Sequence, residues 1–433
     1  MKHFFVAASA AILIGLSLNA QNPPKGYYKD IFMDSGVMLT SRKVLPVTDI
    51  LGLSMEAFIS TPHRYDKPNK FTARDTLRQH ELIVGSEIDE NGVLFYPDGQ
   101  PRFRMVYMNG GRAKAHLLSI GDDGKESYRK FVAAGGSYLG SCAGAFMASK
   151  SIVKANGKMS REGFDLGLWP GSAQSTGLNK SYTGMDIVKK NPLAKYYDFG
   201  GTMHVDSVYH NGGCRAYMAT APKGTEVLAV YDTKGRGLKY DLTGDPCIWA
   251  WKASESAGRV IMCGSHPEGC AWGENLALMS AMVRYALDGT APAKVKGALE
   301  SGESRIMTAR TSDSDPDHTR IGDRQYHHFT VEVPAKASKL EIRLEGVEGE
   351  NDFDVFLFAN KKGLAFSDNS PWTNVKPGMK KKIVIEKPAK GTWYVSVFCN
   401  TTVNSKKGEY GVEYFGRTDV LNGVPYVVTA TVE

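Results

Sequence analysis

The sequence predicts two units of different fold class, an α/β unit built on a parallel sheet and then an all-β sandwich. In the first 290 residues, apolar runs typical of buried strands alternate with helical segments, which favours a parallel sheet. From residue 326 onward the runs are short, alternate apolar with polar residues and are separated by Gly, Pro and Asn. A chain of 433 residues is long enough for two or three domains.

The N-terminus has the pattern of a signal peptide. A basic start at Lys2 precedes the apolar run 4–18, and Ala20 is the small residue at the expected cleavage position. No later apolar stretch is long enough to span a membrane, so we expect a secreted protein, periplasmic or extracellular. The expected segments are a signal peptide at 1–20, the α/β unit at 21–290, a linker at 291–325 and the sandwich at 326–433.

Each element follows from its local pattern. The α/β strands are expected at 30–36, 55–60, 103–108, 203–210, 226–232, 247–252 and 259–263, and the helices at 41–53, 127–134, 143–150 and 274–287. Residues 61–102 are weakly periodic and predict an insertion, and 152–198 predict loops over the site. The sandwich strands are expected at 327–333, 339–344, 353–358, 382–386, 392–398 and 411–415.

A cysteine flanked by glycines stands where a strand is expected to turn into a helix. Residues 140–144 are GSCAG, after an apolar run that ends at Tyr138 and Leu139. A turn this tight leaves no room for side chains beside the central residue, so glycines are needed there. Backbone N–H groups at the start of a helix favour a thiolate. The pattern predicts a nucleophile elbow that presents Cys142.

A histidine and a glutamate far downstream are the partners that a nucleophilic cysteine requires. Residues 264–269 are GSHPEG and follow a short apolar strand. Pro267 prevents a continuing helix, and in an extended or turn conformation residues two apart can face the same way. Glu268 can then orient the ring of His266 and leave its other nitrogen for the thiol. The spacing predicts a triad with Cys142 as the nucleophile.

GSCAG and SHPEG, in this order, resemble the class I glutamine amidotransferase-like superfamily, and in particular the module at the N-terminus of biotin-protein ligase. The resemblance implies a flavodoxin-like sheet that carries a Cys-His-Glu triad. It also implies an oxyanion hole, which Gly110 and Gly111 would form with the backbone amide of Ala143. Asn211 lies in an Asn-Gly-Gly motif that the module shares, and is implied as a substrate-binding residue.

The C-terminal strands carry a second resemblance. DFDVFL at 352–357 and GTWYV at 391–395 look like the pre-peptidase C-terminal (PPC) domain family, a jelly-roll-like appendage of secreted hydrolases. Asp352 and Asp354 have the oxygen ligands that calcium prefers. The alternative is a solvated strand end, because no further carboxylates accompany this pair.

Charge and cysteine content narrow the possible ligands. The net charge of +7 is spread along the chain, so nothing favours nucleic acid. No CxxC motif is present and the ten histidines are scattered, so we expect neither a metal nor a cofactor. Cys263 is expected in the core, since it lies in an apolar strand. A disulfide within the remaining cysteines stays open; these are Cys214, Cys247, Cys270 and Cys399.

The motifs favour a secreted cysteine hydrolase that cleaves an amide or peptide bond through an acyl-enzyme. One alternative is a non-catalytic binding protein that retains the fold, with the sandwich contacting a polymer or surface. Another is a glutaminase subunit that passes ammonia to a partner, although the chain has no GxxxxGK[ST] motif of its own. His204 and His210 are candidate substrate contacts or simply polar-face residues.

Overall fold

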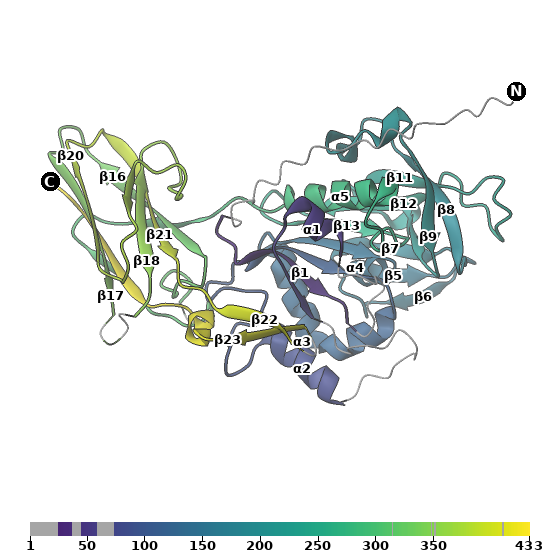
Figure 1. The fold of residues 1–433 in the computed structure, drawn as a ribbon, viewed down its shortest axis with the longest axis horizontal. Coiled ribbons are helices and arrows are strands. Elements are labelled where there is room, and N and C mark those ends of the chain that lie inside the picture. The colour runs from purple at the N-terminus through teal and green to yellow at the C-terminus, as the bar shows by residue number, and fades with distance from the viewer. Residues whose placement is uncertain are drawn as a thin grey trace, which may run out of the picture.

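The computed structural model describes residues 25–36, 45–58, 73–313, 315–347, 349, 352–408 and 411–433. The N-terminal part has mixed sheets with few helices, and the C-terminal part is a β-sandwich beside it (Figure 1). The expected signal peptide at 1–20 lies outside the described residues. None of the helices in the described ranges is both long enough and apolar enough to cross a membrane.

The centre of the large sheet is parallel, as the alternation of strands and helices predicts. Its five strands lie in the order β2-β1-β3-β4-β13 and all pair in parallel. Four antiparallel strands continue this sheet in the order β12-β11-β8-β9. The bounds are β1 (Lys29–Asp34), β2 (Met55–Phe58), β3 (Phe103–Met108), β4 (Ser137–Ser141), β8 (Ser181–Ile187), β9 (His204–His210), β11 (Glu226–Asp232), β12 (Pro246–Lys252) and β13 (Arg259–Cys263).

Helices cover both faces of the parallel strands. Side chains of one strand alternate between two cores: Ile31 and Met33 pack in the core that contains α5, whereas Phe32 packs in the core that contains α3. Burial on both faces explains why these strands are almost continuously apolar. In Figure 1, α5 lies above the sheet and α2 and α3 lie below it. The bounds are α1 (Val47–Leu51), α2 (Ala73–Val84), α3 (Ala113–Ala133), α4 (Ala143–Ala148) and α5 (Gly273–Leu287).

Two expectations about the α/β unit are wrong, whereas the segment 61–102, expected as an insertion, contains helix α2. Helix α3 begins 14 residues before the expected position, with a kink at Gly121 (φ 73°, ψ −179°) that interrupts its periodicity. The segment 152–198 is not a set of loops but contains strands. Their sequences are short and rich in Ser and Gly, so they lack the apolar run that marks a strand. One separate sheet has the order β10-β7-β5-β6, with β5 (Ser149–Val153), β6 (Met159–Glu162), β7 (Trp169–Ser175) and β10 (Cys214–Tyr217).

The C-terminal sandwich consists of two sheets, β14-β16-β21-β18-β19 and β15-β24-β17-β20. Strands β14 and β15 lie within 291–325, where a linker is expected, so sandwich strands begin before residue 326. The bounds are β14 (Val295–Ala298), β15 (Ser304–Met307), β16 (Tyr326–Val333), β17 (Lys339–Gly346), β18 (Val355–Asn360), β19 (Trp372–Asn374), β20 (Lys381–Glu386), β21 (Gly391–Cys399) and β24 (Tyr426–Val432).

A hairpin from the C-terminal part joins the large sheet of the α/β unit. Strands β22 (Asn404–Gly408) and β23 (Gly411–Phe415) add to the edge at β2, where Phe58 pairs with Gly411. The expectation that 411–415 belongs to the sandwich is therefore wrong. An alternating strand pattern fits either sheet, because it records which faces are buried and not which edge is paired.

A buried arginine also links the two parts. Arg102 is 1% exposed and donates to both carboxylate oxygens of Asp323, at 3.1 and 3.2 Å. Its guanidinium lies 4.6 Å from the ring centre of Tyr28 and 5.6 Å from that of Tyr414, which comes from β23. Buried charges need partners of this kind, so the contact fixes the sandwich against the α/β unit.

Candidate active site

The predicted triad residues come from loops that follow adjacent parallel strands. Met108 at the end of β3 pairs with Gly140 of β4, and Cys263 at the end of β13 pairs with Ser141. The chain segments after β3, β4 and β13 therefore leave the sheet at the same edge. In open α/β sheets, ligands bind outside the carboxyl ends of the strands, which is the edge found here.

Cys142 has a backbone conformation that non-glycine residues rarely adopt. Its φ is 46° and its ψ is −100°, directly between β4 and α4, and its N–H donates to the Cys263 carbonyl at 2.8 Å. Both flanking glycines are required by close contacts. A Cβ at Gly144 would lie 2.1 Å from the Met108 oxygen, and one at Gly140 would lie 2.5 Å from the Gly144 carbonyl carbon. Such local strain is maintained by surrounding structure and is concentrated at functional sites.

The structure brings His266 and Glu268 together. The Nδ1 atom of His266 lies 2.9 Å from Oε1 of Glu268, whose side chain is 1% exposed. Burial disfavours the charged ring, but the Glu268 carboxylate and the contact with Cys142 outweigh it and raise the pKa of His266 to about 11. The ring is therefore an imidazolium at neutral pH. The nearby Cys142 thiol is one of the causes of the raised pKa of His266.

Both reacting groups are largely buried but not sealed. Cys142 is 5% exposed, and the side chain of His266 is 10% exposed. The ring of Tyr209 lies 5.8 Å from that of His266, and the exposed Tyr182 lies 5.5 Å from Tyr209. The two tyrosine rings thus lie in a row from the imidazole to an exposed side chain.

Asn211 contacts the site through its backbone. Its carbonyl oxygen accepts from Sγ of Cys142 at 3.7 Å, while its side-chain Oδ1 accepts from the Lys180 N–H at 3.1 Å. The following Gly213 packs directly on the turn before His266, since a Cβ there would lie 1.8 Å from the Gly264 oxygen. Gly213 is thus needed for close approach of two backbones, and the side chain of Asn211 holds the segment just before β8 against this turn.

Sequence reasoning missed the role of His210, which is fully buried beneath the two turns. Its Nε2 lies 2.7 Å from the Thr176 hydroxyl and its Nδ1 lies 2.9 Å from the Ser265 hydroxyl. Thr176 donates to the Gly213 carbonyl at 3.0 Å, so it accepts from Nε2–H, and Nδ1 accepts from Ser265. Burial, with the charge on His266, lowers the pKa of His210 to about 4. This neutral ring holds Ser265, the residue before His266.

The expected oxyanion turn lies beside the start of α4. Gly110 is buried and Gly111 has a φ of 133°, and the turn they form follows β3 directly. The close contact between Gly144 and the end of β3 places this turn next to the first turn of α4, where Ala143 is the first helical residue. The role of these three amides in stabilising an oxyanion stays a prediction.

The remaining candidate residues have structural partners. Asp354 accepts from the Gly378 N–H at 2.7 Å, and Asp352 pairs with Arg417 at 3.3 Å. His204 lies at the sheet edge between two aspartates, which are Asp186 and Asp206. Within the described ranges, no three His, Cys, Asp or Glu side chains are grouped as a metal site.

All six cysteines are free thiols in the structure, so the open possibility of a disulfide is not realised. Cys214, Cys247 and Cys263 lie on different strands and are fully buried, and burial raises the pKa of each. They behave as small apolar core residues. Cys270 is the most exposed of the six, since the other five are buried.

Two family models match the chain. Residues 90–291 match the family described as biotin-protein ligase, N terminal, and residues 325–398 match the bacterial pre-peptidase C-terminal domain. Both resemblances inferred from the sequence motifs are thereby confirmed.

Individual relatives are more distant. An uncharacterized protein of Chlamydia muridarum (strain MoPn / Nigg) is 32% identical over 142 residues, which is 32% of this chain and half the length of that protein. A glutamine amidotransferase structure is 17% identical and covers 43% of this chain and 79% of its own, with a TM-score of 0.29. The pre-peptidase C-terminal domain of a Bacillus anthracis collagenase is 10% identical and covers 33% of this chain and 99% of its own, with a TM-score of 0.18.

Proposed function

From a chain that joins a glutamine amidotransferase-like module to a pre-peptidase C-terminal domain, we propose that it is an exported cysteine hydrolase of amide or peptide bonds. Cys142 is the nucleophile, His266 the proton donor and acceptor, and Glu268 the group that orients and charges the imidazole. The strand order β2-β1-β3-β4-β13 supports a flavodoxin-like sheet, and the backbone of Cys142 supports a nucleophile elbow.

One observation carries the proposal. The imidazole of His266 lies between the buried carboxylate of Glu268 and the thiol of Cys142, which stands on a strained strand-to-helix turn. A core cysteine needs neither the strain nor the ion pair. An imidazolium beside the sulfur favours the thiolate, which is the form that attacks a carbonyl carbon. Glu268 keeps Nδ1 occupied and leaves Nε2 for the sulfur.

The chemistry follows from these positions. The thiolate attacks the carbonyl carbon, and the N–H groups of Gly110, Gly111 and Ala143 stabilise the oxyanion. When the tetrahedral intermediate collapses, the C–N bond breaks and the leaving amine takes the proton from His266. The neutral imidazole then removes a proton from water, which attacks the thioester. Release of the acid returns the sulfur to its thiolate and the ring to its protonated form.

Labelling with an electrophilic acyl probe tests the nucleophile. We expect the probe to label wild-type protein at Cys142 near neutral pH, and Cys142→Ala to lose this labelling. Cys270→Ser is the matched control, because it removes the most exposed of the other thiols and should leave labelling unchanged. Equal labelling of the Cys142→Ala variant and wild type would exclude this nucleophile.

A second measurement separates the hydrolase from a binding protein that keeps the fold. Iodoacetamide should alkylate Cys142 rapidly at pH 6, and His266→Ala should slow this reaction at least about tenfold, because the cation beside the sulfur is removed. Slow alkylation of wild type with no effect of His266→Ala would favour the binding protein. Release of ammonia from glutamine, measured on the same variants, tests the glutaminase alternative.

A further inference from the structure

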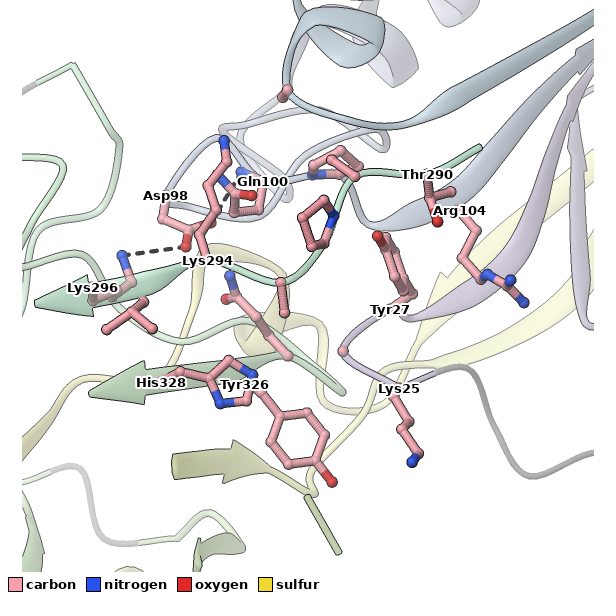
Figure 2. Close-up of a pocket in the computed structure, with 18 of the residues that line it drawn as sticks. Lys25, Tyr27, Asp98, Gln100, Arg104, Thr290, Lys294, Lys296, Tyr326 and His328 are labelled. Carbon is pink, nitrogen blue, oxygen red and sulfur yellow. Dashed lines mark hydrogen bonds and ion pairs between the residues drawn. The ribbon is translucent and has the colours of Figure 1, made fainter. Parts of the chain in front are cut away.

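A second cavity lies between the two parts of the chain, at the opposite edge of the parallel sheet from Cys142. Its volume is about 610 Å³, within the range of small-molecule sites. Figure 2 shows Tyr27, Arg104 and Thr290 of the α/β unit on one side, and Tyr326 and His328 of β16 on the other. Arg104 lies near the start of β3, whereas Cys142 follows the end of β4. The cavity is therefore separate from the proposed hydrolase site.

One wall of the cavity contains a buried histidine with a free ring nitrogen. His328 is 2% exposed, and its Nδ1 lies 2.6 Å from the hydroxyl of Ser396. Ser396 is fully buried and has no other acceptor among the described residues, so its hydroxyl donates to Nδ1. Burial lowers the pKa of His328 to about 4, so the ring is neutral and carries its proton on Nε2. That N–H has no protein acceptor in the described part of the chain.

A buried glutamine supplies further unpaired donors. Gln325 is 3% exposed, and its Oε1 accepts from the backbone N–H of Gly322 at 2.8 Å, which fixes the orientation of the amide. Its NH2 group also lines the cavity and has no acceptor within the described ranges. His328 and Gln325 are thus both more than nine-tenths buried. In each side chain one polar atom has a protein partner, and an N–H donor remains without a protein acceptor in the described part of the chain. Neither donor atom is among the fully buried atoms without a partner in the described residues, so both face the open cavity, where a bound ligand can accept from them.

The charged side chains around the cavity also leave a cation available to an anionic ligand. Four cationic side chains line the cavity, and three of them already pair with carboxylates: Lys25 with Asp368, Arg104 with Asp30 and Lys296 with Asp98. Asp98 is neutralised by Lys296 at 3.2 Å, as the dashed line in Figure 2 marks. Lys294 has no carboxylate within 4 Å in the described part of the chain. An anion would therefore meet two side-chain donors, from His328 and Gln325, and one cation, Lys294, that has no carboxylate partner among the described residues.

The apolar surface of the cavity is aromatic. Tyr326 stacks on His328 with ring centres 5.7 Å apart and planes 6° apart, and Phe366 lies 5.1 Å from Tyr326. Flat rings favour a flat ligand group, which can stack or meet them edge to face. From the unpaired donors, the cation Lys294 and these rings, we propose that the cavity is a binding site for a small aromatic carboxylate. The carboxylate accepts from His328 and Gln325, and the ring lies against Tyr326 and Phe366.

Calorimetric titration of the mature chain with two matched probes tests this site. N-acetyl-L-phenylalanine carries the carboxylate and the ring, and N-acetyl-L-phenylalaninamide is its neutral counterpart. We expect the acid to bind once per chain and the amide to bind at least about tenfold more weakly, because unpaired donors prefer a charged acceptor. Equal affinities, or no binding of the acid at millimolar concentration, would overturn the proposal.

Charge-reversal variants then test whether the acid binds in this cavity. Lys294→Glu reverses an exposed charge at the cavity and should weaken binding of the acid at least about tenfold. Lys390→Glu makes the same change on an exposed lysine elsewhere on the sandwich and should leave affinity unchanged. Gln325→Glu keeps an oxygen for Gly322 but replaces the free donors, and should abolish binding while unfolding cooperatively. Equal effects of Lys294→Glu and Lys390→Glu would refute the location.

Binding of the acid in this cavity does not depend on the proposed hydrolase activity. Cys142→Ala should bind the acid as tightly as wild type, because the two sites lie at opposite edges of the sheet. Loss of binding in Cys142→Ala would contradict the separation of the sites. Failure of the acyl probe to label Cys142 would leave the carboxylate titration unaffected.

Discussion

Neutralising Glu268 should change the reactivity of Cys142 in a way that follows from one distance. In Glu268→Gln the side chain can still accept from Nδ1 of His266, but the negative charge 2.9 Å away is lost. Two unit charges at that separation attract by about 6 kcal/mol at an effective dielectric constant of about 20. Since one pH unit corresponds to about 1.4 kcal/mol, the pKa of His266 should fall by about 4 units from its value of about 11.

The sign of the effect on alkylation follows from the charge of the ring. A raised pKa keeps the imidazolium, and its stabilisation of the thiolate, up to about pH 11 in wild type. Loss of charge on the ring should therefore not lower the alkylation rate of Cys142 anywhere below about pH 9. In Glu268→Gln a pKa near 7 leaves about three quarters of the rings neutral at pH 7.5, so most molecules lose the counter-ion of the sulfur and the rate should fall about threefold.

The assay is iodoacetamide alkylation followed by mass spectrometry, in a Cys270→Ser background that removes the most exposed other thiol. Glu255→Gln is the matched control, because Glu255 is fully exposed and its removal should leave the profile unchanged. Circular dichroism verifies that both variants are folded. Superimposable pH profiles for Glu268→Gln and wild type would refute the ion-pair argument.

Three further predictions concern stability. Gly144→Ala should lower the free energy of unfolding by about 3 kcal/mol because its Cβ would overlap the backbone of β3, whereas Gly269→Ala, with open space around its Cβ, should cost less than about 1 kcal/mol in the same denaturant titration. Arg102→Met should destabilise by about 3–5 kcal/mol because Asp323 is left buried and unpaired, and adding Asp323→Leu should restore most of that loss. The pKa of His210 is lowered to about 4, so the folded state binds fewer protons than the unfolded state. Wild type should lose about 3 kcal/mol as pH falls from about 6.5 to 4, and His210→Gln should lose less over the same range.

The sequence by itself determined the features that local patterns record. Continuous apolar runs marked the parallel strands because both faces of those strands are buried. Glycines around Cys142 marked a turn in which a Cβ would overlap neighbouring backbone, and Pro267 beside His266 marked the point where a helix cannot continue. The motifs therefore identified Cys142, His266 and Glu268, which the structure places in contact.

Only the tertiary structure decided how these pieces are held. The hairpin 404–415 pairs with β2 rather than with the sandwich, and Arg102 meets Asp323 across 221 residues of chain. His210 sits in a strand with ordinary alternation, yet its ring fixes Ser265 beneath the site. Periodicity states whether a face is buried, but the identity of the partner depends on long-range contacts that leave no local signal. The candidate catalytic residues lie in turns, and the sheets to which those turns are attached set their positions.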